Sequence, residues 1–354
     1  MEASKTEPRR RPFGEVFSKN PVARRGSAFM LTIIDTDPGI DDAMAILLAL
    51  SSEKLRVTAL TIVHGNLGVL DPLVRNAHRV LRLAQRTDVR VVRGASKPLA
   101  RAEHSGAPFV HGDDGMGDVV DESTLDAIVS EQSDLSAAAF LVEESRREGE
   151  MLHVVALGPL TNLALAQQLD TSFGSRVKLY AMGGCFLVPG NVSTNAEANV
   201  WNDPEAADLV FSAFASVVLS PLDVTTSIKW GSEYAARLRA AAPRIGGFIE
   251  QITRRYLEFH RHAMGRDSCD FHDSSAVLSL VAPELFSRQE QHWVRVETRD
   301  GLTRGVCVAD LRNSLENPVN FPKTVRLMLA ADPAACLAFY ADSIARLERR
   351  LTSS

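Results

Sequence analysis

The segment LTIIDTDPGIDDAMAILLAL, residues 31–50, requires a strand, a turn and a helix around a concentration of negative charge. The apolar run before the turn predicts a buried strand, and the longer apolar run after it predicts a buried helix. Its four aspartates lie within eight residues, at positions Asp35, Asp37, Asp41 and Asp42. Two carboxylates about 5 Å apart repel by about 3 kcal/mol at an effective dielectric constant near 20. A loop with this charge at the edge of a core must therefore take up protons or bind a cation.

The donor chemistry of this loop favours a hard cation, Ca²⁺ first and Mg²⁺ second, because only oxygen ligands are at hand. An EF-hand is excluded, because its twelfth position should be Glu and the twelfth residue from Asp35 is Ile46. Counting from Asp37 puts Asp42 at the sixth position, where that motif requires Gly. An aspartyl-nucleophile phosphatase also begins with Asp-x-Asp after a strand, but the Pro-Gly turn and the second aspartate pair are unlike it. Helix capping explains one or two of the acids but not four.

Short apolar runs alternate with amphipathic segments along most of the chain. The runs that predict strands are 31–35, 57–63, 89–94, 152–158, 177–183 and 216–223. The segments that predict helices between them include 71–86, 134–148, 161–169 and 204–214. This alternation predicts an α/β fold with a mostly parallel central sheet flanked by helices, in which ligands bind beyond the carboxyl ends of the strands. Helices then dominate 232–281, and two short strands (293–298 and 305–310) precede a last helix near 332–350.

Length and composition fit one globular domain. The chain has 354 residues, of which 45% are hydrophobic and 23% are charged, and α/β folds of this size commonly form a single domain. We expect residues 30–354 to form it and the polar residues 1–29 to be a disordered extension. A net charge of −5 gives no reason to expect nucleic acid as a partner. No apolar run reaches the roughly 20 residues of a membrane span, so no membrane partner is expected.

The four cysteines are widely spaced, with no Cys-x-x-Cys pair, at Cys185, Cys269, Cys307 and Cys336. No secretory signal precedes them, so neither structural disulfides nor a zinc–thiolate site is expected. This pattern of cysteines predicts a protein of the reducing cytoplasm.

A series of motifs follows the acidic loop. They are VHGN (63–66), RNAHRVL (75–81), HGDDGMG (111–117), ALGPLTNLALA (156–166), MGG (182–184), GNVSTNAEANVWNDPEAA (190–207), LDVT (222–225), FHDSSAV (271–277) and LTRGVCVAD (302–310). Together with DTDPGIDDAMAI (35–46), they resemble the inosine–uridine-preferring nucleoside hydrolase family from about Leu31 to the C-terminus. A single piece such as LGPLTN is weakly specific. The aspartate loop, the AEAN and DPEAA segments and the His-Asp pair, in this order, are strongly specific.

The resemblance implies hydrolysis of the N-ribosidic bond of ribonucleosides with a tightly held Ca²⁺, giving free base and ribose. The cation would be held by the side chains of Asp37, Asp42 and Asp273 and by the main-chain carbonyl of Leu157. Asp37 would also be the general base that takes a proton from a metal-bound water, and His272 would lie beside the leaving base. These residue types suit the reaction, because carboxylates stabilise an oxocarbenium-like sugar and a histidine can donate a proton near neutral pH.

The resemblance also assigns residues to the sugar and to the base. The ribose hydroxyls would be bound by Asp41, Asn66, Asn191, Glu197 and Asn199. His111 would be a second histidine on the base side, and Asp35 would support the acidic loop through hydrogen bonds. Relatives close a helix over the base, which makes Tyr256 and His260 candidates for that contact here.

Plain structural roles stay open for several of these residues. Asp273 could cap a helix, and His111 and His272 could be ordinary histidines. Asn66 could be a turn residue after its strand, and the AEAN segment could only shape a turn. Where many relatives carry an aromatic residue between the Glu and the Asn of that segment, this chain has Ala198, which leaves the sugar and base preference open.

The His-Asp pair favours the uridine/inosine type of enzyme over the purine-only type, with pyrimidine ribonucleosides expected first. Two other functions stay open, namely hydrolysis of another N-riboside, such as a nicotinamide or modified-nucleoside riboside, and a catalytically inactive nucleoside-binding homologue. Relatives are usually dimers or tetramers, so the resemblance implies a homodimer or homotetramer.

Overall fold

A mixed eight-stranded sheet forms the centre of the protein in the computed structural model, which describes residues 29–352 except 102–105, 120–135, 148–150 and 313–320. Seven strands are parallel to their neighbours, and β9 is antiparallel to β12 at one edge. In spatial order the strands are β3 (Arg90–Arg93), β2 (Leu55–Ile62), β1 (Met30–Thr36), β4 (Leu152–Ala156), β5 (Val177–Met182), β6 (Val217–Ser220), β12 (Val325–Ala330) and β9 (Arg288–His292).

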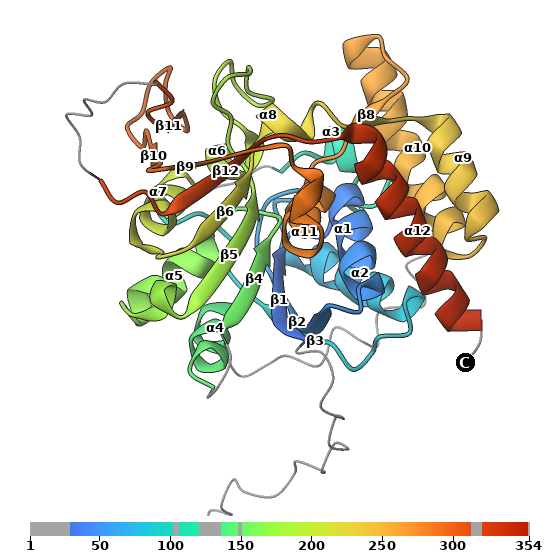
Figure 1. Cartoon of the computed structure of the whole chain (residues 1–354), viewed down its shortest axis with the longest axis horizontal. Helices are drawn as coiled ribbons and strands as arrows, with labels where there is room; N and C mark the ends of the chain where they lie inside the picture. The colour runs from blue at the N-terminus through green and yellow to red at the C-terminus, as the bar shows by residue number, and fades with distance from the viewer. Residues whose placement is uncertain (1–28, 102–105, 120–135, 148–150, 313–320, 353–354) are drawn as a thin grey trace, which may run out of the picture.

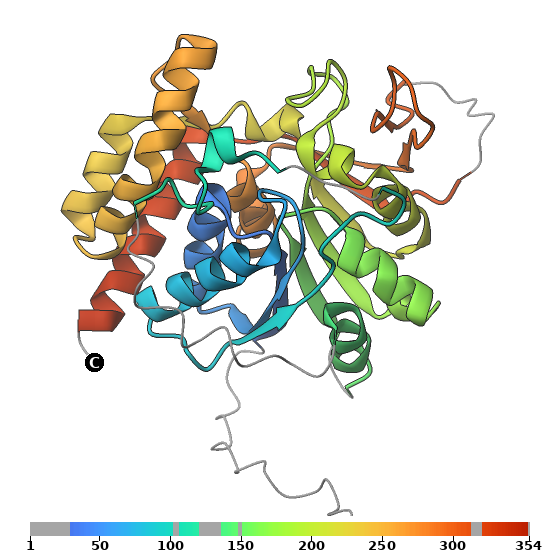
Figure 2. The same cartoon turned by 180° about the vertical axis from the view of Figure 1, so that it is seen from behind.

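Two groups of helices cover the sheet (Figures 1 and 2). The larger group consists of α1 (Ile40–Ser51), α2 (Leu70–Leu83), α9 (Ser232–Ala241), α10 (Ile245–Met264), α11 (Asp273–Val281) and α12 (Pro333–Thr352). The smaller group consists of α4 (Ala137–Ser145), α5 (Thr161–Leu169) and α7 (Pro204–Ala213). Short elements at the ends of the strands complete the described part, namely α3 (Pro108–His111), α6 (Ala198–Asn202), α8 (Leu222–Thr225), β7 (Lys229–Trp230) and β8 (Cys269–Asp270).

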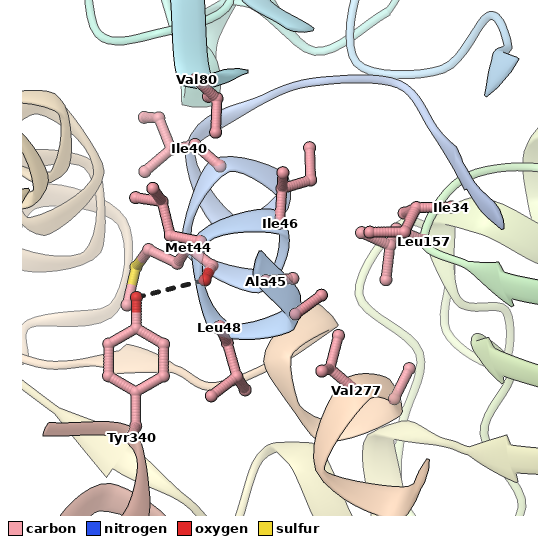
Figure 3. Close-up of a cluster of buried hydrophobic side chains, with 14 of the residues drawn as sticks. Ile34, Ile40, Met44, Ala45, Ile46, Leu48, Val80, Leu157, Val277 and Tyr340 are labelled. Carbon is pink, nitrogen blue, oxygen red and sulfur yellow. Dashed lines mark hydrogen bonds between the residues drawn. The ribbon is translucent and has the colours of Figure 1, made fainter. Parts of the chain in front are cut away.

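The sheet separates two apolar cores because neighbouring residues of a strand point to opposite faces. In β1, Ile34 packs with the larger helix group and Ile33 with the smaller one. Helix α1 is buried nearly all round, with Asp41 as its one partly exposed residue, which explains its nearly unbroken apolar sequence. Figure 3 shows its packing against Val277 of α11 and Tyr340 of α12, whose hydroxyl donates to the Met44 carbonyl at 3.2 Å.

The predicted fold class is confirmed, and the structure corrects three details of the predicted strands. Strands β9 and β12 were not predicted. Strand β9 is a polar edge strand without an apolar pattern. Strand β12 pairs with β6, which is distant in the sequence. The predicted strand 216–223 ends at Ser220, because Pro221 precedes the short helix α8. The predicted strands 293–298 and 305–310 shrink to β10 (Arg295–Val296) and β11 (Cys307–Val308), which pair only with each other.

No helix among the described residues is long and apolar enough to cross a membrane. The expected disordered extension, residues 1–29, lies outside the described residues up to position 28.

Candidate active site

One cavity of about 480 Å³ gathers every residue assigned to the site from the sequence. It lies beyond the carboxyl ends of β1, β2, β4 and β5, where the fold predicts ligands to bind. Its lining includes Asp37, Asp41, Asp42, Asn66, His111, Leu157, Asn191, Glu197, Asn199, His272 and Asp273. Tyr256 and His260 of α10 line it as well. The cavity is large enough for a small-molecule ligand of nucleoside size.

Three carboxylates from opposite ends of the chain converge at the floor of this cavity. Asp41 and Asp42 open α1, Asp273 opens α11, and oxygen atoms of the three lie within 4.8 Å of one another. Burial raises the pKa of all three carboxyls, and the neighbouring acids raise the pKa of Asp42 and Asp273 further. A divalent cation bound by oxygen ligands removes this penalty, so the donor set fits a hard metal ion. The group contains Asp41, which the resemblance assigns to ribose, and omits Asp37, so the choice between these two as ligands stays a prediction.

The carboxylate of Asp37 lies in a narrow slot between two glycines. A Cβ atom at Gly65 would fall 1.8 Å from its Oδ2 atom, and one at Gly158 would fall 2.4 Å from its Oδ1 atom. The main-chain N–H of Asn66 donates to Oδ2 at 2.7 Å. Burial, followed by repulsion from Asp42, raises the pKa of Asp37 well above its usual value. Only glycine leaves room for a carboxylate this close to two main chains.

Asp35, near the end of β1, is held by hydrogen bonds from two neighbouring elements. Its Oδ1 atom accepts hydrogen bonds from the Thr61 hydroxyl and, at 2.8 Å, from Asn162 Nδ2. Burial raises the pKa of Asp35 to about 7, although both hydrogen bonds lower it. Asp35 is completely buried, so it holds the loop from inside the protein.

The asparagine of the VHGN motif holds carboxylates in place. Asn66 Nδ2 donates to Asp42 Oδ2 at 2.9 Å and to the Asp37 carbonyl at 2.8 Å. The Gly39 N–H donates to the same Asp42 oxygen at 3.0 Å, and the Thr36 hydroxyl donates to the other one. Asp42 is therefore anchored by main-chain, amide and hydroxyl donors of adjoining segments.

The AEAN segment forms the opposite wall. Glu197 is the N-cap of α6 and accepts hydrogen bonds from the N–H groups of Asn199 and Gly184, at 2.9 and 2.8 Å. Burial raises its pKa to about 7. Asn199 Nδ2 donates to the Leu157 carbonyl at 2.6 Å, and Asn191 Oδ1 accepts from the Ala198 N–H at 3.0 Å. These residues therefore shape a turn, as their structural role predicts, and they also line the cavity.

Histidines and aromatic rings line the same cavity. His272 Nδ1 is 2.9 Å from the Thr225 hydroxyl, and burial lowers the pKa of His272. The Ile40 N–H donates to His111 Nδ1 at 3.4 Å, and burial lowers the pKa of His111 to about 4. The lowered pKa values favour the neutral form of both imidazoles near pH 7.

Helix α10 contributes aromatic side chains to the cavity wall. Tyr256 stacks on His111 with ring centroids 6.1 Å apart and meets His260 edge-on at 4.6 Å. Phe109 and Phe259 also line the cavity, with centroids 5.8 Å apart, and the sequence analysis missed both. Their position beside His111 and His260 in the chain was the available signal.

The arrangement defines a class of protein, an α/β protein with a nucleoside-sized cavity that is lined by acids and amides and by histidines and aromatic rings. The comparisons identify the family. The chain belongs to the inosine-uridine preferring nucleoside hydrolase family, whose model matches residues 32–338.

Relatives agree along most of the chain. It is 38% identical over 280 residues to a probable uridine nucleosidase 2 of Oryza sativa subsp. japonica, which covers 79% of this chain and 81% of that protein. It is 39% identical over 277 residues to uridine nucleosidase 1 of Arabidopsis thaliana, which covers 78% of this chain and 79% of that protein. A solved structure titled plant nucleoside hydrolase PpNRh1 enzyme superposes with a TM-score of 0.81 and 32% identity, covering 89% of this chain and 99% of that chain.

Proposed function

We propose that this protein hydrolyses the N-ribosidic bond of ribonucleosides, with uridine and other pyrimidine ribonucleosides first, and releases free base and ribose. The observation that carries the proposal is that two kinds of residue line one cavity, clustered acids and a pair of histidines. The first suits a sugar that gains positive charge, and the second suits a base that leaves with negative charge. Two relatives named uridine nucleosidases support the pyrimidine preference.

In the proposed reaction, Asp37 takes a proton from water as the water oxygen attacks C1′ of the ribose. The C1′–N bond breaks, its electron pair stays on the base nitrogen, the neutral His272 ring donates a hydrogen bond to the base, and the base then takes a proton from solvent. If the Thr225 hydroxyl donates to His272 Nδ1, the neutral ring carries its proton on Nε2, where it can serve the base. Asp41, Asn66, Asn191, Glu197 and Asn199 orient the ribose through its hydroxyls.

The proposed cofactor is Ca²⁺, because the clustered donors are all oxygen atoms. Asp42 and Asp273 would hold it, together with Asp37 and the Leu157 carbonyl. When bound, the cation supplies positive charge that orients sugar hydroxyls and acidifies water. The raised pKa values of the clustered acids support a cation whatever its identity.

A substrate panel tests the proposal. The purified full chain is incubated with uridine, cytidine, inosine, adenosine and nicotinamide riboside, and released ribose is measured as reducing sugar. We expect the highest kcat/KM with uridine, no turnover after chelation, and recovery on adding Ca²⁺. Faster release of ribose from nicotinamide riboside than from uridine would show that the substrate is another N-riboside. No release from any of the five with Ca²⁺ present would identify a nucleoside-binding homologue without turnover.

We propose a cytoplasmic homodimer or homotetramer. The four cysteines are all free and buried, as suits a reducing compartment. Light scattering coupled to size-exclusion chromatography measures the assembly, and a monomer at micromolar concentration would contradict it.

A further inference from the structure

A buried hydrogen-bonded chain runs behind the Asp37 slot through residues to which nothing above assigns a role. His64 Nε2 lies 2.9 Å from the Thr161 hydroxyl oxygen, and that hydroxyl donates to Asp203 Oδ2 at 2.7 Å. At most 1% of each residue is exposed. The three come from the loop after β2, the first turn of α5 and the residue before α7. The chain thus ties three separate segments together inside the protein.

The donors and acceptors of this chain have a fixed direction. Because the single Thr161 proton points to Asp203, the Thr161 oxygen must accept, and His64 Nε2 must carry the proton. Asp203 is held in turn by the N–H groups of Leu99, at 2.9 Å, and Ala206, at 3.0 Å. It is also the N-cap of α7. The chain therefore connects a fixed carboxylate to the histidine.

The two loops joined by His64 and Thr161 are the two walls of the slot. His64 directly precedes Gly65, and Thr161 follows Gly158 by three residues. These are the glycines whose main chains enclose the two Asp37 oxygens. A change in the distance between His64 and Thr161 would therefore change the width of the slot.

We propose that His64, Thr161 and Asp203 are positioning residues that set the width of this slot and thereby the orientation of the Asp37 carboxylate. The inference rests on the proposed function, in which Asp37 is the general base. A misplacement of about 1 Å in a reacting group can lower a rate about 10²-fold. The chain has this effect without touching the substrate, because none of its three residues lines the cavity.

Two matched pairs of variants test the inference on the full chain. Thr161→Val removes the hydroxyl at nearly constant volume, whereas Thr161→Ser keeps it. His64→Leu removes the Nε2 donor, whereas His64→Gln places an amide N–H at similar reach. With uridine and Ca²⁺, we expect kcat to fall about 10- to 100-fold in Thr161→Val and His64→Leu, with KM within about threefold. Thr161→Ser and His64→Gln should recover most of that kcat.

Crystal structures of the wild type and of Thr161→Val supply a readout apart from activity. We expect the Gly65 and Gly158 main chains to separate and the Asp37 carboxylate to rotate in the variant. An unchanged slot would overturn the inference, as would equal kcat values for Thr161→Val and Thr161→Ser. If the wild type turns over no nucleoside, the proposed function fails, and the crystal structures still decide whether the chain positions Asp37.

Discussion

Two groups of cavity residues are built in different ways: the acidic end, which is Asp37, Asp41, Asp42 and Asp273, and the aromatic end, which is Phe109, Tyr256 and Phe259. At the acidic end, side chains extend from strand ends and helix starts and are held by main-chain N–H groups, as Asp37 is by Asn66 and Asp42 is by Gly39. At the aromatic end, α10 meets α3 and the loop after it through side chains, with Phe109 of α3 against Phe259 and an ion pair between Arg255 and Asp118 of that loop. The first construction leaves little freedom, because two glycine main chains enclose a carboxylate. The second construction allows single side chains to be replaced without moving the main chain.

This difference teaches where substitutions should act. Changes at the acidic end should lower kcat, because they displace groups that act on the reacting atoms. Changes at the aromatic end should alter KM and base preference, because apolar contacts bind substrate and transition state alike. The predictions below run from the largest expected effect to the smallest.

Asp37→Ala should produce the largest effect. We expect kcat on uridine to fall by about 10³-fold or more, since a general base contributes about 10²- to 10⁴-fold and its geometry is lost as well. The melting temperature without Ca²⁺ should not fall, because the substitution removes a buried carboxyl whose pKa is raised by burial and by Asp42. Ribose release and thermal unfolding measure the two effects. Near-normal turnover would refute the role of Asp37.

Gly65→Ala should come second, because its new Cβ would fall 1.8 Å from Asp37 Oδ2. We expect kcat to fall by about 10²-fold with a smaller change in KM. Gly247→Ala is the matched control, since a Cβ there, within α10, would have no atom within 4 Å. That substitution should leave activity unchanged and stabilise the protein by about 0.4–1 kcal/mol. Equal activities of the two variants would show that the slot is not tight.

Phe109→Ala probes the aromatic end. Phe109 is 65% exposed, so its removal should scarcely affect folding, but it lines the cavity against Phe259. An aromatic pair contributes about 0.5–1.5 kcal/mol, so we expect KM for uridine to rise about 2- to 10-fold with kcat nearly constant. Leu169→Ala, on an exposed face of α5 and away from the cavity, should change neither constant. A fall in kcat without a rise in KM would contradict the predicted difference between the two ends.

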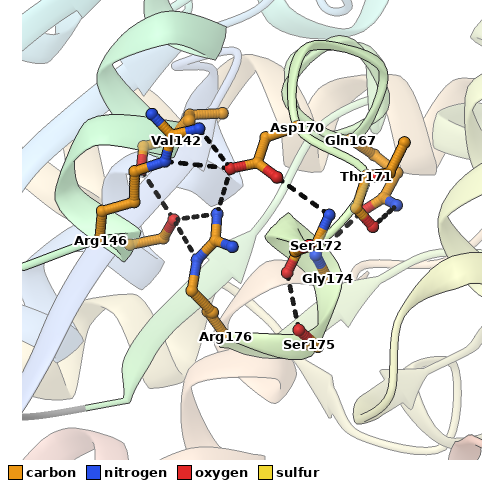
Figure 4. A network of polar contacts seen from close by, with 10 residues as sticks. Val142, Arg146, Gln167, Asp170, Thr171, Ser172, Gly174, Ser175 and Arg176 are labelled. Atoms are coloured by element: carbon orange, nitrogen blue, oxygen red, sulfur yellow. Dashed lines mark hydrogen bonds and ion pairs between the residues drawn. The ribbon is translucent and has the colours of Figure 1, made fainter.

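Asp170→Asn should have the smallest effect, and it lies outside both ends. Asp170 accepts hydrogen bonds from Arg146 at 2.6 Å, Arg176 at 2.8 Å and the Ser172 N–H at 3.0 Å (Figure 4). These contacts, led by Arg146, lower its pKa to about 2. A lowered carboxyl pKa stabilises the fold above the unfolded value near 4 and loses that stabilisation as the pH falls toward 2.

The melting temperature of Asp170→Asn should therefore lie slightly below that of the wild type between pH 5 and 7. The gap should close as the pH falls from about 4 to 2, and uridine turnover at pH 7 should stay unchanged. Calorimetry across that pH range measures the gap. A gap that widens in acid would contradict the sign.

Much of the fold could be predicted from local patterns, whereas the lining of the site followed from the resemblance to a family. Apolar runs and amphipathic segments predicted the parallel sheet, and the resemblance implied that Asp37, Asn66, Glu197 and His272 share a cavity. Edge strand β9 carries no such pattern, since its RQEQH sequence is polar and mostly exposed. Phe109 and Phe259 were not predicted as cavity residues, because an aromatic residue in a core and one at a cavity wall have the same local sequence pattern.

By itself, the sequence determined that four acids lie at and just after the end of the first strand and that they need protons or a cation, because repulsion between carboxylates does not depend on the rest of the fold. Only the tertiary structure decided that Asp273 joins Asp41 and Asp42, and that Gly65 and Gly158 enclose Asp37. The physical reason is one of range. Periodicity and turn chemistry act over a few residues, whereas the width of a slot depends on how strands and helices distant in the sequence pack together.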